Sequence, residues 1–134
     1  MTDIKDIEGI GPVYGAKLTT AGVSTVEALL ERGATRRGRT ALPAATAISS
    51  KRLLKWTNRA DLFRINGVNE EYSDLLEAAG VDTVVELAQR NPTHLYAALA
   101  STNEAKQLVR RLPSASEVAG WIEEAKRLPR VMEY

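Results

Sequence analysis

The sequence predicts an all-α protein that forms a single compact domain from two related helical units. Apolar residues recur at helical spacing between residues that begin and end helices, and no alternation with a period of two persists. Shifted by 58 positions, the sequence also matches itself at ten places between residues 4–30 and 62–88. In the first copy the identical residues are Ile7, Gly9, Tyr14, Leu18, Ala21, Gly22, Val23, Thr25, Val26 and Leu29.

The self-match indicates that each half is one supersecondary unit. We expect residues 4–61 to form the first repeat, residues 62–128 the second, and residues 129–134 a C-terminal tail. A shift of 65 positions places Trp56 on Trp121, and the two repeats are expected to pack about a pseudo-twofold axis. The tail ends with apolar residues after a proline and would dock on the domain or on a neighbour.

In the first repeat, Pro12 suits the first turn of a helix that stops at Gly22 in a left-handed conformation. Ser24 is expected to cap a short helix that ends near Gly33. The next helices are expected over 36–47 and 51–60, capped by Thr35 and by Ser49 or Ser50. Pro43 should kink or shorten the first of these two.

The second repeat is expected to hold five helices. Their ranges are 70–79, 83–90, 93–101, 103–111 and 115–128. Asp82 and Ser114 are the candidate caps. Trp56 and Trp121, together with Tyr14 and Tyr72, are expected to fill the core.

Composition argues against several classes of protein. The chain has no cysteine and one histidine, His94, so neither a thiolate site nor a histidine cluster is available. There is no long apolar run and no signal-peptide pattern, so we expect a cytoplasmic protein that contacts no membrane. No phosphate-binding loop is present, and the adjacent pairs Glu70-Glu71 and Glu123-Glu124 diverge on their helices. Catalysis is therefore not expected.

Charge is unevenly distributed although the net charge is only +1. Residues 1–31 carry a net charge of −3, residues 32–64 carry +8, and residues 65–134 carry −4. The cations of this middle basic block are Arg32, Arg36, Arg37, Arg39, Lys51, Arg52, Lys55, Arg59 and Arg64. Lys51, Lys55 and Arg59 are spaced to line one helical stripe. The block is either a surface for a polyanion or a solvated surface that balances the acidic flanks.

The turn Gly9-Ile10-Gly11 between two predicted helices makes a helix-hairpin-helix. Glycines permit positive φ, and the turn exposes N–H groups at a helix N-terminus, where an oxyanion fits. The alternative is a tight corner between two helices. In the second copy Asn69 is expected to take the left-handed conformation of Gly11. Glu70, Glu71 and Asp74 repel a phosphate there, so this hairpin is expected to be structural.

The chain resembles the helix-hairpin-helix superfamily over Ile4–Leu30 and again over Leu62–Ala88. As a whole it looks like a bacterial domain-of-unknown-function family built of tandem helix-hairpin-helix units. The stretches that carry this resemblance are IEGIGPVYGAKLTTAGVSTVEALL, ISSKRLLKWTNRADLFRINGV, AAGVDTVVELAQRNPTHL and EVAGWIEEAKRLP. The resemblance implies binding to DNA or RNA backbone without sequence preference, and hairpin carbonyls that sometimes hold a potassium or sodium ion.

A second, local resemblance is to the helix-turn-helix pattern over LPAATAISSKRLLKW. Pro43 and Ala47 depart from that pattern, because a small helix former and a glycine are typical there. The segment is therefore expected to connect two helices rather than read base sequence.

The sequence thus predicts a non-enzymatic protein that binds nucleic-acid backbone through the first hairpin and the basic block. The predicted contact residues are Gly9, Ile10, Gly11, Lys17, Arg36, Arg37, Arg39, Lys51, Arg52, Lys55 and Arg59. No cofactor is expected apart from a monovalent cation at the first hairpin. The alternative is a protein-protein interaction or scaffold module without nucleic-acid binding, and the oligomeric state is left open.

Overall fold

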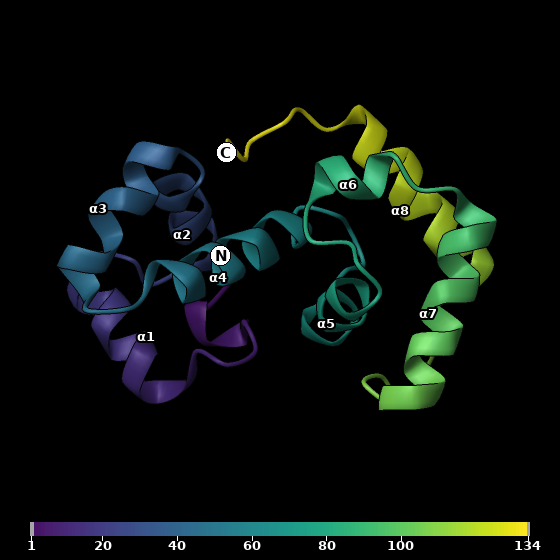
Figure 1. Ribbon diagram of the computed structural model, residues 1–134, viewed down its shortest axis with the longest axis horizontal. Coiled ribbons are helices and arrows are strands. Elements are labelled where there is room, and N and C mark those ends of the chain that lie inside the picture. The colour runs from purple at the N-terminus through teal and green to yellow at the C-terminus, as the bar shows by residue number, and fades with distance from the viewer. Residues whose placement is uncertain (1, 134) are drawn as a thin grey trace. The chain divides into compact units, whose positions relative to one another are not determined.

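The structure is a computed structural model that describes residues 2–133, and the regular secondary structure of this range consists of helices and one isolated β-bridge between Asp3 and Thr25. A short 3₁₀ helix, Ile4–Asp6, comes first. The α-helices that follow are α1 (Gly11–Thr20), α2 (Val26–Gly33), α3 (Arg36–Thr46), α4 (Ser50–Leu62), α5 (Glu70–Ala78), α6 (Val84–Ala88), α7 (Pro92–Lys106) and α8 (Ala115–Arg127) (Figure 1). The all-α prediction is confirmed.

The chain forms two compact units. The first contains Met1–Asp61 together with Val131–Tyr134, and the second contains Leu62–Arg130. The end of the chain therefore belongs to the unit that holds its beginning. The Glu133 N–H donates to the Ala34 carbonyl (2.7 Å), and the side chain of Met132 is buried.

In the first unit, α2 packs against α3, and α1 packs against α3 and the 3₁₀ helix. The N-terminal segment is tied to the start of α2, because the Val26 N–H donates to the Thr2 carbonyl (2.9 Å) and the Ile4 N–H donates to the Ser24 carbonyl (3.2 Å). The large buried side chains of this unit include Ile4, Ile7, Ile10, Leu18, Leu29, Leu42, Leu53 and Trp56.

In the second unit, α8 packs against α6 and α7, and α5 packs against α7. Its core gathers side chains from every helix of the unit, among them Ile65, Leu75, Leu76, Leu87, Leu95, Leu99, Trp121 and Ile122. Tyr72 also joins this core, and its hydroxyl donates to the Arg111 carbonyl (3.0 Å).

Two glycines bring the helices of the first unit into close contact. A Cβ added to Gly33 would lie 2.4 Å from the Thr57 hydroxyl oxygen, and one added to Gly38 would lie 1.8 Å from the Arg32 carbonyl oxygen. Gly33 ends α2, and Gly38 lies within α3. Arg32 and Arg36 therefore stand on different helices and share no continuous helical face.

Threonines, rather than the residues before them, cap two of the short helices. The Thr25 hydroxyl accepts the Ala28 N–H (3.0 Å) at the start of α2, so the prediction of Ser24 is wrong by one residue. The Thr83 hydroxyl likewise accepts the Glu86 N–H (3.4 Å) at α6, so the prediction of Asp82 is also wrong by one residue. In each case the threonine has the extended backbone that aims its hydroxyl at the third residue of the helix.

Three other predicted caps are in place. Thr35 caps α3 by accepting the Gly38 N–H, and the Ser49 hydroxyl accepts the Arg52 N–H at the start of α4. Ser114 caps α8 and forms a capping box with Glu117. These residues satisfy N–H groups that the first helical turn leaves unpaired.

The two helices predicted over 93–101 and 103–111 are one helix, α7, which ends at Lys106. Gln107 then takes a left-handed conformation (φ 51°). The Asn103 side chain folds onto the following segment, where it accepts the Val109 N–H (3.0 Å) and donates to the Val109 carbonyl (3.3 Å). Asn103 therefore closes the end of α7 instead of opening another helix.

Helix α3 continues to Thr46 and is not cut short at Pro43. The proline removes the hydrogen bond that its own N–H would donate to the preceding turn, and the helix continues for three residues beyond it. The helix ends where Ala47 becomes left-handed (φ 57°), with its N–H donating to the Pro43 carbonyl (2.9 Å). Ala47 thus has the conformation for which glycine is typical in a helix-turn-helix.

Candidate nucleic-acid interface

The first hairpin presents an uncapped helix start. Gly9 and Gly11 both have positive φ, 92° and 60°, while the Ile10 side chain between them is 1% exposed and anchors the turn. No side chain caps α1. The N–H groups of Gly11 and Val13 donate to none of the residues from 2 to 133, and Pro12 has no N–H. Val13 is 68% exposed, so this end of α1 is open to solvent.

The second hairpin has the same first glycine but a different helix start. Gly67 has φ 87°, close to that of Gly9. Asn69 is extended (φ −101°), so the prediction that it copies the left-handed Gly11 is wrong. Its side chain instead accepts the Tyr72 N–H (3.0 Å), and Glu70 and Glu71 occupy the first turn of α5. The start of α5 is therefore capped by a side-chain amide and carries two carboxylates in its first turn. The start of α1 has neither.

Tyr14 joins the first hairpin to the basic block within the first unit. Its ring lies 5.2 Å, centroid to centroid, from the ring of Trp56 on α4. Lys17 Nζ lies 5.7 Å from the Tyr14 ring centroid, and Arg52 Cζ lies 5.2 Å from it. A cation from α1 and a cation from α4 therefore each lie against the same ring, although they are far apart in sequence.

Most of the other predicted cations are exposed. Arg36 and Arg37 on α3, and Lys51 and Lys55 on α4, lie at the surface. Arg36, Arg37 and Lys51 make no ion pair within the part of the chain that the structure describes. For these three side chains, the prediction of a surface that is neutralised by acidic neighbours is not met.

Arg39 and Arg59 differ from the surface cations that the sequence predicts. The Arg39 guanidinium is half-buried and donates to the carbonyls of Gly33 (2.8 Å) and Ala34 (3.0 Å), and also to that of Glu133. Arg59 is 6% exposed, so the stripe of Lys51 and Lys55 does not continue to it. Arg39 is a structural clamp at the end of α2, because the last carbonyls of a helix attract cations.

A groove with three of the predicted cations lies between α3 and the start of α4. It measures about 720 Å³ and is lined by Arg36, Arg39, Thr40, Pro43, Ser50, Lys51 and Leu54. Thr40, Pro43, Ser50 and Leu54 are not among the predicted contact residues. Thr40 lies one helical turn after Arg36, so helical spacing alone places it beside that cation.

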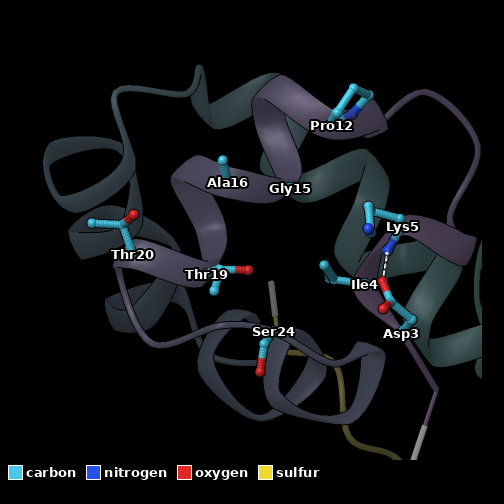
Figure 2. A pocket seen from close by; sticks show the side chains of 9 residues that line it. All are labelled: Asp3, Ile4, Lys5, Pro12, Gly15, Ala16, Thr19, Thr20 and Ser24. Carbon is cyan, nitrogen blue, oxygen red and sulfur yellow. Dashed lines mark hydrogen bonds between the residues drawn. The ribbon is translucent and has the colours of Figure 1, made fainter.

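A second hollow, of about 420 Å³, lies along α1 and is lined by Asp3, Ile4, Lys5, Pro12, Gly15, Ala16, Thr19, Thr20 and Ser24 (Figure 2). Lys5 packs against α1, because a Cβ added to Gly15 would lie 3.1 Å from its Cγ. The Asp3 carboxylate accepts the Lys5 N–H (2.8 Å). With one cation and one carboxylate, this hollow does not have the positive charge of the groove.

Metal-binding clusters and membrane-spanning helices are both absent from the described range. No group of three or more His, Cys, Asp or Glu side chains is placed to hold a metal ion between residues 2 and 133. Over the same residues, no helix has both the length and the apolar character to cross a bilayer. The single histidine, His94, is exposed in the first turn of α7.

A family model described as a domain of unknown function, DUF4332, matches residues 8–128. The chain belongs to the DUF4332 family. No curated protein and no solved structure matches it. The DUF4332 match begins just before the first hairpin and ends at the end of α8, so it covers the hairpin, Tyr14 and the whole basic block.

Proposed function

We propose that this DUF4332 protein binds the sugar-phosphate backbone of nucleic acid, without reading base sequence and without catalysis. The observation that carries the proposal is that Lys17 of α1 and Arg52 of α4 each lie within 6 Å of the centroid of the Tyr14 ring. It supports a contact surface that includes cations of both the helix after the hairpin and the basic block. Phosphate contacts from such a surface position a strand but carry no sequence information.

The open start of α1 supports the same surface. The N–H groups of Gly11 and Val13 and the positive end of the helix dipole are available at the start of α1, the helix that carries Lys17 in its last turn. Exposed cations without ion pairs, such as Arg36, Arg37 and Lys51, have no carboxylate partner that a polyanion would have to displace. Arg39 and Arg59 are left out of the proposed contacts because their side chains serve the fold or are buried.

We also propose that the two units are copies of one helix-hairpin-helix unit, and paired local geometry supports this. Gly9 and Gly67 have φ of 92° and 87°, and Gly22 and Gly80 have φ of 89° and 95°. A Cβ added to Gly9 would lie 3.6 Å from Trp56 Nε1, and one added to Gly67 would lie 3.4 Å from Trp121 Nε1. The Tyr72–Trp121 ring centroids are 5.3 Å apart, against 5.2 Å for Tyr14 and Trp56. A pseudo-twofold relation between the copies stays a prediction.

In this proposal the two copies have different roles. The second hairpin presents Asn69, Glu70 and Glu71 where the first presents open N–H groups, so the second hairpin supports the fold and does not bind phosphate. A monovalent cation held by the carbonyls of the first hairpin remains part of the proposal. Its test is a comparison of nucleic-acid affinity in potassium and in a large organic cation at equal ionic strength.

The main test is a titration of labelled duplex DNA followed by fluorescence anisotropy at several salt concentrations. The variant is Lys17→Gln with Arg52→Gln, and the matched control is Lys106→Gln with Arg127→Gln, two exposed cations of the second unit. We expect the first variant to bind more weakly and to lower the salt slope by about one for each phosphate that it no longer neutralises. The control, with the same change in net charge, should bind like the wild type.

Two outcomes would contradict the proposal. Equal losses of affinity in both double variants would indicate that the protein attracts DNA by its net charge alone. Equal affinity of all three proteins would show that Lys17 and Arg52 do not contact the DNA. Recovery of a protein partner that survives nuclease treatment, from a chain that binds no duplex, would favour the interaction or scaffold module instead.

A further inference from the structure

The groove between α3 and α4 is a feature separate from the hairpin and Tyr14. Its seven lining residues come from α3 and from the first turns of α4. Its volume is about 720 Å³, and it is largely open to solvent rather than enclosed. A site of this size is larger than a single oxyanion needs.

The charges in the groove are all positive. Arg36, Arg39 and Lys51 line it, and no acidic residue does. Arg36 and Lys51 are exposed and have no ion-pair partner in the described part of the chain. Arg39 is fixed in place by the carbonyls of Gly33 and Ala34, so it contributes charge at a constant position. An anion in the groove would meet no carboxylate among the lining residues.

The uncharged lining residues divide into one available donor and an apolar part. The Thr40 hydroxyl donates to the Arg36 carbonyl (2.9 Å), so its proton is already used. The Ser50 hydroxyl makes no hydrogen bond to any residue that the structure describes, which leaves it available to an anion. Pro43 and Leu54 are half-buried and supply the apolar part. Cations, one free hydroxyl and an apolar wall fit a phosphate and the carbon atoms next to it.

We propose that this groove binds one sugar-phosphate unit, with the phosphate on Arg36, Lys51 and Ser50 and the sugar against Pro43 and Leu54. This inference deepens the proposed function and rests on it where the unit comes from a nucleic-acid strand. A free mononucleotide carries the same chemistry, and the experiment below distinguishes the two sources. The groove gives the protein a second point of contact, on α3 and α4, beside the hairpin surface.

The experiment is a titration of the full ¹⁵N-labelled chain followed by the backbone amide signals of Thr40, Ser50, Lys51 and Leu54. The probes are thymidine 5′-monophosphate, thymidine, inorganic phosphate and a short oligothymidylate. We expect saturable shifts at these amides with the monophosphate and the oligothymidylate, none with thymidine, and weaker binding of inorganic phosphate. A strand as the natural source is indicated when the oligothymidylate saturates the groove at lower concentration than the monophosphate.

The matched variants are Arg36→Gln with Lys51→Gln, and Lys106→Gln with Arg127→Gln as the control of equal charge. Removal of two charge-assisted hydrogen bonds should weaken binding of the monophosphate by roughly tenfold or more, and the control should leave it unchanged. Circular dichroism of both variants checks that the fold is kept.

The inference is overturned by any of three results. These are no saturable shift at the groove with either the monophosphate or the oligothymidylate, equal affinity for inorganic phosphate and the monophosphate, or unchanged affinity in Arg36→Gln with Lys51→Gln. The failures of the two proposals are distinct. A strand whose binding depends on Lys17 and Arg52, but not on Arg36 and Lys51, overturns the groove and leaves the proposed function standing.

Discussion

The rings of Tyr14 and Trp56 lie against each other with centroids 5.2 Å apart and planes inclined by 60°. One partner is on α1, just after the hairpin, and the other is on α4. Tilted pairs of this kind add about 0.5–1.5 kcal/mol beyond the area that they bury. The pair therefore packs α1 against the basic helix α4, and the Tyr14 ring lies within 6 Å of both Lys17 Nζ and Arg52 Cζ.

Replacing Tyr14 tests whether its ring gathers the two cations. Tyr14→Leu should weaken duplex binding by several-fold to about thirtyfold, because each cation–π contact is worth about 0.5–1 kcal/mol at an exposed site. Tyr14→Phe keeps the ring and should bind like the wild type. Anisotropy titrations at one fixed salt concentration measure both. Equal binding by the leucine and phenylalanine variants would show that the ring does not organise the cations.

Gly38→Ala should strongly destabilise the protein. The added Cβ would lie 1.8 Å from the Arg32 carbonyl oxygen, and backbone cannot rotate away as a flexible side chain does. We expect a loss of stability at or above the upper end of the ~1–3 kcal/mol that overpacking costs, measured by urea unfolding. Gly120→Ala in α8 is the control, since nothing lies within 4 Å of its Cβ, and it should be neutral or stabilising by about 0.5–1 kcal/mol.

Ala47→Gly should stabilise the first unit. Ala47 is left-handed at the end of α3, a conformation that costs about 1–2 kcal/mol for residues with a Cβ. Glycine removes that cost but loses more backbone entropy, so the net gain is at most about 1 kcal/mol. Ala45→Gly, inside the same helix, should instead destabilise by about 1 kcal/mol. The midpoint temperature of thermal unfolding should therefore rise for Ala47→Gly and fall for Ala45→Gly.

Glu117 makes part of the stability depend on acid pH. Its hydrogen bond from Arg111 (2.9 Å) and that from the Ser114 N–H (3.0 Å) lower its pKa from 4.5 to about 2. A carboxylate whose pKa is lower when folded stabilises the protein fully above pH ~4.5, and this contribution disappears as the pH falls towards 2. As the pH falls through this range, the midpoint temperature of thermal unfolding should decrease less steeply for Glu117→Gln than for the wild type.

The control for this pH series is Glu104→Gln. It removes an exposed carboxylate in the last turn of α7, which is not among the hydrogen-bond partners of Arg111 or Ser114. The midpoint temperature of this variant should change with pH as that of the wild type does. The same slope in all three proteins would mean that the Arg111–Glu117 pair and its capping box do not contribute to acid unfolding.

The helical elements and the caps Thr35, Ser49 and Ser114 were predictable from the sequence because they depend on neighbouring residues. Pro12 in the first turn of α1 and the left-handed Gly22 after it follow from local backbone chemistry. The errors at Ser24 and Asp82 come from adjacent residues that both have capping side chains. Which one caps the helix depends on the backbone angle of each residue, and the sequence does not state that angle.

The candidate site was less predictable because it depends on contacts between distant residues. Charge counting found Lys17 and Arg52, but nothing in the sequence places both over Tyr14. The same counting included Arg39 among the surface contacts, although its donors are taken by the carbonyls of Gly33, Ala34 and Glu133. Every residue has a backbone carbonyl, so the sequence does not show which cations donate to one. A cation bound to the backbone therefore cannot be distinguished from an exposed cation by charge counting.

The return of the chain to its first unit has a consequence for synthesis on the ribosome. Arg39 and Ala34 precede the second unit in the chain, but their hydrogen-bond partner Glu133 is made only after the whole of that unit. Domains usually fold as their residues emerge. Here the N-terminal half waits for the whole second unit to be translated before these contacts can form, so a nascent chain that stalls after Asp61 carries an incomplete first unit.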